Sequence, residues 1–406
     1  MTKCASKLSK VYTLFKNLKV YQRIALFLPA GLQVKNHGLL GISQNDCILS
    51  KVLYIVSPLT RREALKTAFV TGALAGAATL ELTGCTRIGS NGNVAASNTA
   101  KPVTGSTFAF DTYCTFTVYG DDSALAKLSD TCQRYDALFD LYDEKSDIAR
   151  INAAAGQPVS VDPATTDLIA RALDYCAEAD GRFDITIGAV STLWDFTAGT
   201  RATDEQIAAA LPHVNWQNVI VDERAGTVQL TDSEAKLDLG GIAKGYVADC
   251  LCKLLRDETN ATAAVLSLGG NVAFYGQKPG GGTWDTGIRD PNDPGGSTTV
   301  GTAHVTGGSL VTSGLYERTF ELDGVTYWHI LDPQTGMPVQ TDVESVTVAC
   351  PSSTTADALS TTLFVAGSQD GAAIADAHDG TAAYFLLQNG STAESSRWQE
   401  LTGFER

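Results

Sequence analysis

A glycine-rich turn that leads into an amphipathic helix pattern places the strongest constraint on how this chain can fold. Residues 237–245 read Leu-Asp-Leu-Gly-Gly-Ile-Ala-Lys-Gly, and a helical pattern continues through Leu255. Glycines let the backbone approach a ligand closely, and a helix start offers free N–H groups and a positive dipole end. Lys244 adds a mobile cation at the same place. The stretch therefore suits a phosphate or pyrophosphate, although an ordinary strand-to-helix turn with a surface lysine accounts for the same residues.

Charge is distributed unevenly along the 406 residues. The whole sequence holds 30 Lys and Arg residues against 45 Asp and Glu residues. Residues 1–84 contain 11 of the basic residues and 3 of the acidic ones. Residues 85–406 are thus left with 19 basic against 42 acidic side chains. A nucleic-acid-binding surface needs a concentration of basic side chains. We therefore expect no nucleic-acid partner.

The first 84 residues have the features of an export signal. Residues 60–66 resemble a twin-arginine motif, and a weakly apolar run over residues 68–80 is shorter than the ~20 residues that span a bilayer. The tetrapeptide that ends at Cys85 resembles a lipobox. The order of these elements predicts cleavage before Cys85 and lipidation of its sulfur. The mature protein is then expected at the extracytoplasmic face of a bacterial membrane, held there by a lipid anchor.

The remaining chain divides into a tether and a folded part. Residues 85–106 are rich in Gly, Ser, Asn, Thr and Ala, which predicts a flexible tether. Residues 107–406 predict one α+β domain with largely antiparallel or mixed sheets and packed helices. Helices are expected over residues 121–142, 161–179, 204–210, 243–255 and 356–364, with a turn or short helix over 144–152. Strands are expected over residues 107–119, 183–187, 218–221, 227–230, 263–268, 272–275, 299–306, 309–312, 318–322, 326–330, 343–349 and 382–387.

Three further clusters carry groups able to bind a metal or a phosphate. Asp357, Ser360 and Thr361 lie three and four positions apart on an expected helix, so they share one face. Their oxygens suit Mg²⁺, although the cap of a helix explains the same residue types. The other clusters are Thr312-Ser313-Gly314 with Tyr316-Glu317-Arg318, and His329-Ile330-Leu331-Asp332-Pro333 with Thr335-Gly336.

Taken in order, these motifs resemble those of the FAD:protein FMN transferases (ApbE family). They are D-L-G-G-I-A-K-G from residue 238, L-G-G-N from 268, T-S-G-x-Y-x-R from 312, H-I-L-D-P-x-T-G from 329 and A-D-A-L-S-T from 356. The resemblance covers residues 108–367. It implies an enzyme that uses Mg²⁺ to transfer FMN from FAD, its substrate, to a Thr or Ser hydroxyl of an acceptor protein, with release of AMP.

The resemblance also implies roles for single residues. Catalytic roles fall to His329, Asp357 and Lys244, with His329 taking the acceptor proton or binding a phosphate oxygen. Contacts to FAD fall to Phe110, Tyr142, Trp194, Asp195, Phe196, Asp238, Lys244 and Leu331, where Phe110 stands in place of the Met of many members. Mg²⁺ ligands are the Gly241 carbonyl, Asp357 and Thr361, with Ser360 where many members carry a second Asp.

Two other functions stay open at this stage. Water in place of the acceptor would make the protein an FAD pyrophosphatase that yields FMN and AMP. A lipoprotein that binds FAD without catalysis is the other alternative. If the protein is a transferase, its extracytoplasmic location predicts electron-transfer flavoproteins as acceptors.

Overall fold

The structure is a computed structural model that describes residues 101–293 and 297–406. The predicted export signal, the lipidated Cys85 and nearly all of the predicted tether lie outside the described residues. No helix within the two described ranges is both long enough and apolar enough to cross a membrane.

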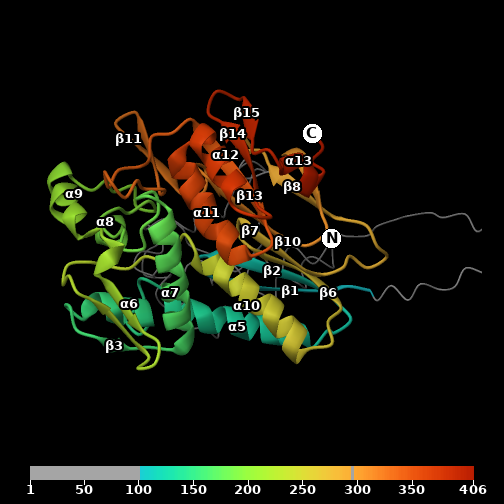
Figure 1. Ribbon diagram of the computed structural model, residues 1–406, viewed down its shortest axis with the longest axis horizontal. Helices are drawn as coiled ribbons and strands as arrows, with labels where there is room; N and C mark the ends of the chain where they lie inside the picture. Colours follow the sequence, from blue (N-terminus) through green and yellow to red (C-terminus); the bar gives the residue numbers. More distant parts are fainter. Residues whose placement is uncertain (1–100, 294–296) are drawn as a thin grey trace, which may run out of the picture. The chain divides into compact units, whose positions relative to one another are not determined.

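An eight-stranded sheet forms the centre of the fold, in the order β1-β2-β6-β7-β10-β13-β14-β15 (Figure 1). Every pair of neighbouring strands in it is antiparallel. Its strands are β1 (Val103–Ala109), β2 (Thr112–Tyr119), β6 (Ala263–Leu268), β7 (Asn271–Gly276), β10 (Gly308–Gly314), β13 (Val343–Cys350), β14 (Ala382–Leu387) and β15 (Thr392–Glu394).

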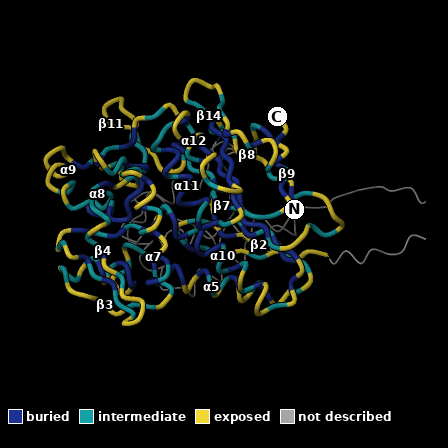
Figure 2. The backbone as a smooth tube through the Cα atoms, in the orientation of Figure 1, coloured by how far each residue is buried: buried dark blue, intermediate teal, exposed yellow. Residues whose placement is uncertain are grey.

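Each face of this sheet is covered by a different layer. Helices α5 (Ala124–Phe139), α10 (Ala243–Glu258), α11 (Ser353–Ala366) and α12 (Ser368–Ala377) pack on one face. The opposite face carries the hairpin of β8 (Trp284–Arg289) and β9 (Thr299–Val305), together with α13 (Trp398–Thr402). Side chains alternate along each strand, so Val311 packs against the α11 side and Leu310 against the hairpin side. Figure 2 shows the buried backbone of α10, α11 and the central strands, whereas most connecting loops are exposed.

A smaller set of elements is inserted between α5 and α10. It contains α6 (Asp147–Ala153), α7 (Pro163–Glu178), α8 (Gly188–Ser191), α9 (Asp204–Ala210) and a sheet of β3 (Val159–Ser160), β5 (Thr227–Leu230) and β4 (Val219–Asp222). A hairpin of β11 (Thr319–Leu322) and β12 (Val325–Trp328) packs its aromatic rings on Trp194 and Phe196, with ring centroids 5.7 Å apart for both Trp194–Tyr327 and Phe196–Phe320.

The prediction of an α+β domain with largely antiparallel sheets is confirmed, but two of the expected strands are wrong. The strand expected over 107–119 is a hairpin, because Phe110 and Asp111 adopt φ values of 54° and 56° and turn the chain. Such turns usually carry Gly or Asn, so the Phe110-Asp111 pair does not predict a turn here. Residues 183–187 form turns around the Asp184 carboxylate, and only Ile187 makes a single bridge to Lys236. The helices α12 and α13 were not expected.

Candidate active site

Helices α10 and α11 approach each other so closely that only glycine fits at position 245. A Cβ there would lie 2.2 Å from the Ser353 carbonyl oxygen and 2.7 Å from Asp357 Cβ. The Gly245 N–H donates a 2.8 Å hydrogen bond to Asp357 Oδ2. Asp249, one turn further along α10, accepts hydrogen bonds from the backbone N–H groups of Ser353 and Thr354 at the start of α11, each 2.9 Å long. The glycine-rich turn and the Asp357 helix are therefore fixed to one another.

Three of the four predicted metal ligands lie together at this junction. A Cβ on Gly241 would lie 3.2 Å from Thr361 Oγ1, and Asp357 Oδ1 lies 3.8 Å from Lys244 Nζ. Within the described ranges, no group of three His, Cys, Asp or Glu side chains could hold a metal ion. A carboxylate, a hydroxyl and a backbone carbonyl form a set of hard oxygen donors that fits Mg²⁺, an ion that keeps several waters and shares phosphate oxygens.

The fourth predicted ligand, Ser360, is buried and already hydrogen-bonded. Its hydroxyl donates to the Asp357 carbonyl oxygen at 2.8 Å and shares a second 2.8 Å hydrogen bond with the Ser313 hydroxyl on β10. These contacts bring the T-S-G motif next to α11. Metal binding by Ser360 stays a prediction, since its hydroxyl serves this contact between helix and strand.

The glycine-rich turn is rigid on its other side as well. Asp238 accepts from the Gly240 N–H at 2.9 Å through Oδ1 and from the Ser191 hydroxyl at 2.7 Å through Oδ2. The Lys244 ammonium donates to the Gly240 carbonyl oxygen at 3.1 Å. Both predicted FAD contacts of this motif, Asp238 and Lys244, thus lie at one turn.

His329 lies near the cations of this site with one ring nitrogen buried. Its Nδ1 has no hydrogen-bond partner among the described residues. Burial, together with the positive charges of Arg318 and Lys244, lowers the pKa of His329 to about 3. The imidazole is therefore neutral at neutral pH, when it can accept a proton or a hydrogen bond.

Arg318 ends the T-S-G-x-Y-x-R motif and belongs to one of the predicted clusters, but no role was predicted for it. Its Nη2 lies 3.9 Å from Asp111 Oδ2 in the β1–β2 turn, and its carbonyl oxygen accepts from the His329 N–H at 3.2 Å. Phe110 in the same turn donates its N–H to Asp136 Oδ1 at 2.8 Å. Phe110 is a bulky residue with positive φ in a two-residue hairpin turn, where glycine or asparagine is usual, and such backbone strain is concentrated at functional sites.

The other predicted FAD contacts divide between packed and exposed positions. Trp194 and Leu331 are buried in one hydrophobic cluster, and Trp194 stacks on Phe196 with centroids 5.7 Å apart and an interplanar angle of 10°. Asp195 is exposed and accepts hydrogen bonds from the Thr197 and Ala198 N–H groups. These residues thus have structural contacts in addition to any contact with a ligand.

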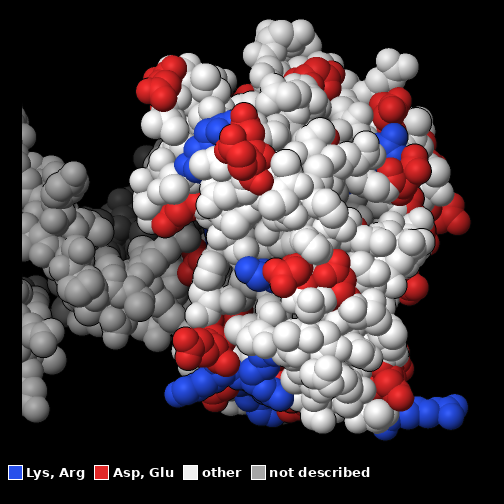
Figure 3. All heavy atoms as spheres, turned by 90° about the vertical axis from the view of Figure 1, so that its left-hand side faces the viewer, with Lys and Arg blue, Asp and Glu red and all other residues white. Residues whose placement is uncertain are grey.

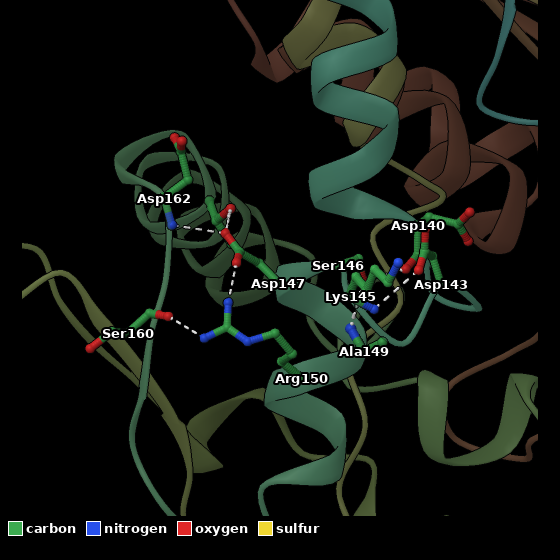
Figure 4. Close-up of polar contacts among 10 residues, drawn as sticks. Asp140, Asp143, Lys145, Ser146, Asp147, Ala149, Arg150, Ser160 and Asp162 are labelled. Atoms are coloured by element: carbon green, nitrogen blue, oxygen red, sulfur yellow. Dashed lines mark hydrogen bonds and ion pairs between the residues drawn. The ribbon is translucent and has the colours of Figure 1, made fainter.

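Tyr142 is an exposed candidate, with 74% of its surface accessible. Partial burial of its hydroxyl and the negative charge of Asp238 raise the pKa of Tyr142. Its loop is held by Asp140, whose carboxylate accepts from the Tyr142 N–H. The Asp140 carbonyl accepts from the Ser146 hydroxyl (Figure 4). In the same view, the buried Asp147 binds Arg150 and the Asp162 N–H, and so anchors the start of α6 to α7.

The face of the molecule in Figure 3 carries Asp and Glu scattered among uncharged residues, and several Lys and Arg side chains there lie beside acidic ones. The described residues on this face form no continuous basic stripe of the kind that follows a nucleic-acid backbone.

Known proteins share both the sequence and the fold. The model of the ApbE family matches residues 110–385, a range that contains every predicted site residue except Cys85. An FAD:protein FMN transferase of Treponema pallidum (strain Nichols) is 36% identical over 283 residues, which cover 65% of this chain and 77% of that protein. One from Klebsiella pneumoniae (strain 342) is 35% identical over 276 residues, which cover 67% of this chain and 85% of that protein.

Solved structures agree with this relationship. The ApbE protein of Thermotoga maritima MSB8 has a TM-score of 0.69 at 32% identity, over 74% of this chain and 99% of that chain. The flavinyl transferase ApbE of Pseudomonas stutzeri, in its apo form, has a TM-score of 0.66 at 28% identity, over 75% of this chain and 98% of that chain. With its motifs, its fold and the matched range in agreement, this chain belongs to the ApbE family.

Proposed function

We propose that this protein transfers FMN from FAD to a Thr or Ser hydroxyl of an acceptor protein and releases AMP, in a reaction that requires Mg²⁺. The observation that carries the proposal is the meeting of Lys244 with Asp357, 3.8 Å apart, beside Gly241 and Thr361. A cation, a carboxylate and a glycine-rich helix start at one point suit a pyrophosphate together with its metal. The relatives named FAD:protein FMN transferase support the same substrate and product.

The reaction needs positioning and charge neutralisation more than covalent help from the enzyme. The acceptor oxygen forms a bond to the phosphorus of the FMN half of FAD. The bond from that phosphorus to the bridging oxygen breaks, and AMP leaves with that oxygen. The acceptor proton passes to a base or to solvent.

The chain offers a group for each of these needs. When bound to Asp357, Thr361 and the Gly241 carbonyl, Mg²⁺ would neutralise charge on the phosphate oxygens. Lys244 and Arg318 add two positive charges near His329. His329 has a buried and unpartnered Nδ1, so it suits either acceptance of the hydroxyl proton or a hydrogen bond at the phosphate.

One incubation separates this function from its two alternatives. Purified protein, FAD and Mg²⁺ are combined with and without the apo form of a bacterial flavoprotein domain that carries FMN on threonine. Covalent flavin fluorescence on that domain, with AMP released in equal amount, is the expected result. FMN and AMP formed equally without it would identify a pyrophosphatase, and intact FAD bound to the protein would identify a binder without catalysis.

We also propose that the protein is exported and lipid-anchored through Cys85, so that its acceptors are extracytoplasmic electron-transfer flavoproteins. The twin-arginine-like and lipobox-like sequences support this location. Expression of the full chain with C85S, followed by membrane fractionation, tests it. The wild type should stay with the membrane and incorporate a lipid label, and the variant should do neither. Equal membrane association and labelling would contradict the lipid anchor.

A further inference from the structure

A cleft lies on the face of the large sheet that is remote from α10 and α11. It is a cleft of about 230 Å³ between the sheet surface and the β8 strand. Thr312 and Thr347 line it from neighbouring strands, and their hydroxyls share a 2.9 Å hydrogen bond. Tyr316 and Glu317, in the loop after β10, also line it. None of the residues to which an FAD contact or a metal-ligand role was assigned lines this cleft, although Thr312, Tyr316 and Glu317 belong to one of the predicted clusters.

The β8 wall of the cleft is an unoccupied strand edge. Four consecutive residues, from Thr286 to Arg289, line it. Neighbouring side chains of a strand point to opposite faces, so a cleft that touches all four runs along the edge of the strand. Within the described residues β8 pairs with β9 alone. The backbone groups of its other edge are therefore available to an extended segment, as in recognition by strand addition.

The cleft is separated from the candidate active site by the thickness of one strand. Thr312 lines the cleft, whereas the next residue, Ser313, bonds to Ser360 on α11, one turn from Asp357. Consecutive Cα atoms lie ~3.8 Å apart. The loop after β10 also connects the cleft to the candidate active site. Glu317 lines the cleft, and the next residue, Arg318, faces Asp111 near His329.

We propose that this cleft binds the acceptor protein, as an extended polar segment next to the hydroxyl that receives FMN. The segment adds along the free edge of β8 and passes the end of β10 to reach the phosphate held near Lys244 and Asp357. This inference rests on the proposed transferase function, which requires a protein segment beside the pyrophosphate and a place to bind it.

The lining of the cleft suits such a segment better than it suits an apolar ligand. Thr286, Thr312 and Thr347 line the cleft, and a hydroxyl that already makes one hydrogen bond, as those of Thr312 and Thr347 do with each other, can still form another. Burial and the charge of Glu317 raise the pKa of Tyr316 to about 12, so its phenol stays a donor at neutral pH. Arg289 and Glu317 place one charge of each sign at the cleft, and no ion pair among the described residues engages either. Charged groups of the bound segment that pair with Arg289 and Glu317 would determine in which direction the segment runs along the cleft.

The test separates acceptor binding from FAD binding. The full-length variants R289E and S267L change the charge and the free volume of the cleft, and R224E changes an exposed arginine of the β4–β5 turn as the matched control. For each protein we would measure KM for the apo flavoprotein domain, kcat, the Kd for FAD by flavin fluorescence, and the midpoint of thermal unfolding.

We expect R289E and S267L to raise KM for the acceptor domain at least tenfold. The Kd for FAD and the unfolding midpoint should stay near those of the wild type, and R224E should change none of these values. An acceptor KM within twofold of wild type in both folded variants would overturn the assignment. A loss of FAD affinity equal to the rise in KM would also overturn it, because the cleft would then belong to FAD. A wild type that modifies no acceptor domain would instead refute the transferase function itself, and the cleft assignment with it.

Discussion

The backbone N–H of Gly245 donates a 2.8 Å hydrogen bond to Asp357 Oδ2, across 112 positions of the sequence. This bond leaves Oδ1 facing the Lys244 ammonium, 3.8 Å away. The two oxygens of one carboxylate therefore have different tasks. One joins α10 to α11, and the other is available to a metal ion and the charges around it.

Replacement of Gly245 by alanine should disrupt this junction. The added methyl group would lie 2.2 Å from the Ser353 carbonyl oxygen, so the two helices must separate. Overpacking of this kind costs about 1–3 kcal/mol of unfolding free energy, and we expect activity to fall as well because Asp357 shifts. Urea unfolding and flavinylation rates measure the two effects. G307A, where nothing lies within 4 Å of the added carbon, is the matched control. Equal stability of G245A and G307A would contradict the close approach.

Replacement of Asp357 by alanine should remove Mg²⁺-dependent flavinylation. The loss should be at least about 10²-fold, the size typical of losing one group that stabilises transition-state charge. The rate is followed by covalent flavin fluorescence over a series of Mg²⁺ concentrations. D370N on α12, an exposed carboxylate, should behave as the wild type. Wild-type rates in D357A would exclude Asp357 as a metal ligand.

Lys244 should contribute to FAD affinity through the pyrophosphate. Hydrogen bonds to charged groups contribute about 1.5–3 kcal/mol, so K244A should weaken FAD binding by roughly tenfold to a hundredfold. Quenching of flavin fluorescence reports the Kd. Lys253 is exposed on the same helix, and K253A should leave the Kd unchanged. If both variants bind FAD as tightly as the wild type, the glycine-rich turn is no phosphate site.

His329 should make stability depend on pH below neutrality. Folding lowers its pKa from 6.5 to about 3, so between these values the unfolded chain binds more protons than the folded chain. The free energy of unfolding therefore rises with pH across this window and falls on acidification. H329Q lacks the titrating ring and should lose less stability than the wild type between about pH 7 and pH 4.5. Urea unfolding at both values gives the difference, and parallel losses in the two proteins would contradict the buried neutral imidazole.

Asp249 should act on the metal site through the start of α11. Its carboxylate accepts hydrogen bonds from Ser353 and Thr354 N–H groups, and loss of a helix cap costs about 1 kcal/mol. D249N should lower stability by about that amount and raise the Mg²⁺ concentration for half-maximal activity, because α11 carries Asp357 and Thr361. D257N, at the end of α10, is the control. A purely structural role would lower stability without changing the Mg²⁺ requirement.

Local sequence patterns predicted the elements that carry the site. The 3.6-residue period and the Asp162-Pro163 start give α7, and the Ala356–Phe364 pattern gives most of α11. The hairpin turn at Phe110 was missed because its positive φ values are imposed by surrounding contacts, including the bond from its N–H to Asp136. The motif that ends at Arg318 was recognised, but the role of this arginine was not predicted, because its spacing in the sequence does not show which groups it faces. Its relation to Asp111 and His329 exists only after the strands pair.

The sequence by itself determined the motifs, the α+β class and the residue types needed for phosphate and Mg²⁺ chemistry, since these depend on local spacing. Only the tertiary structure decided that the glycine-rich turn meets Asp357 and Thr361, that Ser360 bonds to Ser313, and that a cleft lies behind β10. The physical reason is that these relationships arise from strand pairing and helix packing between segments far apart in the chain. Such contacts depend on how whole faces fit together, which no short stretch of residues specifies.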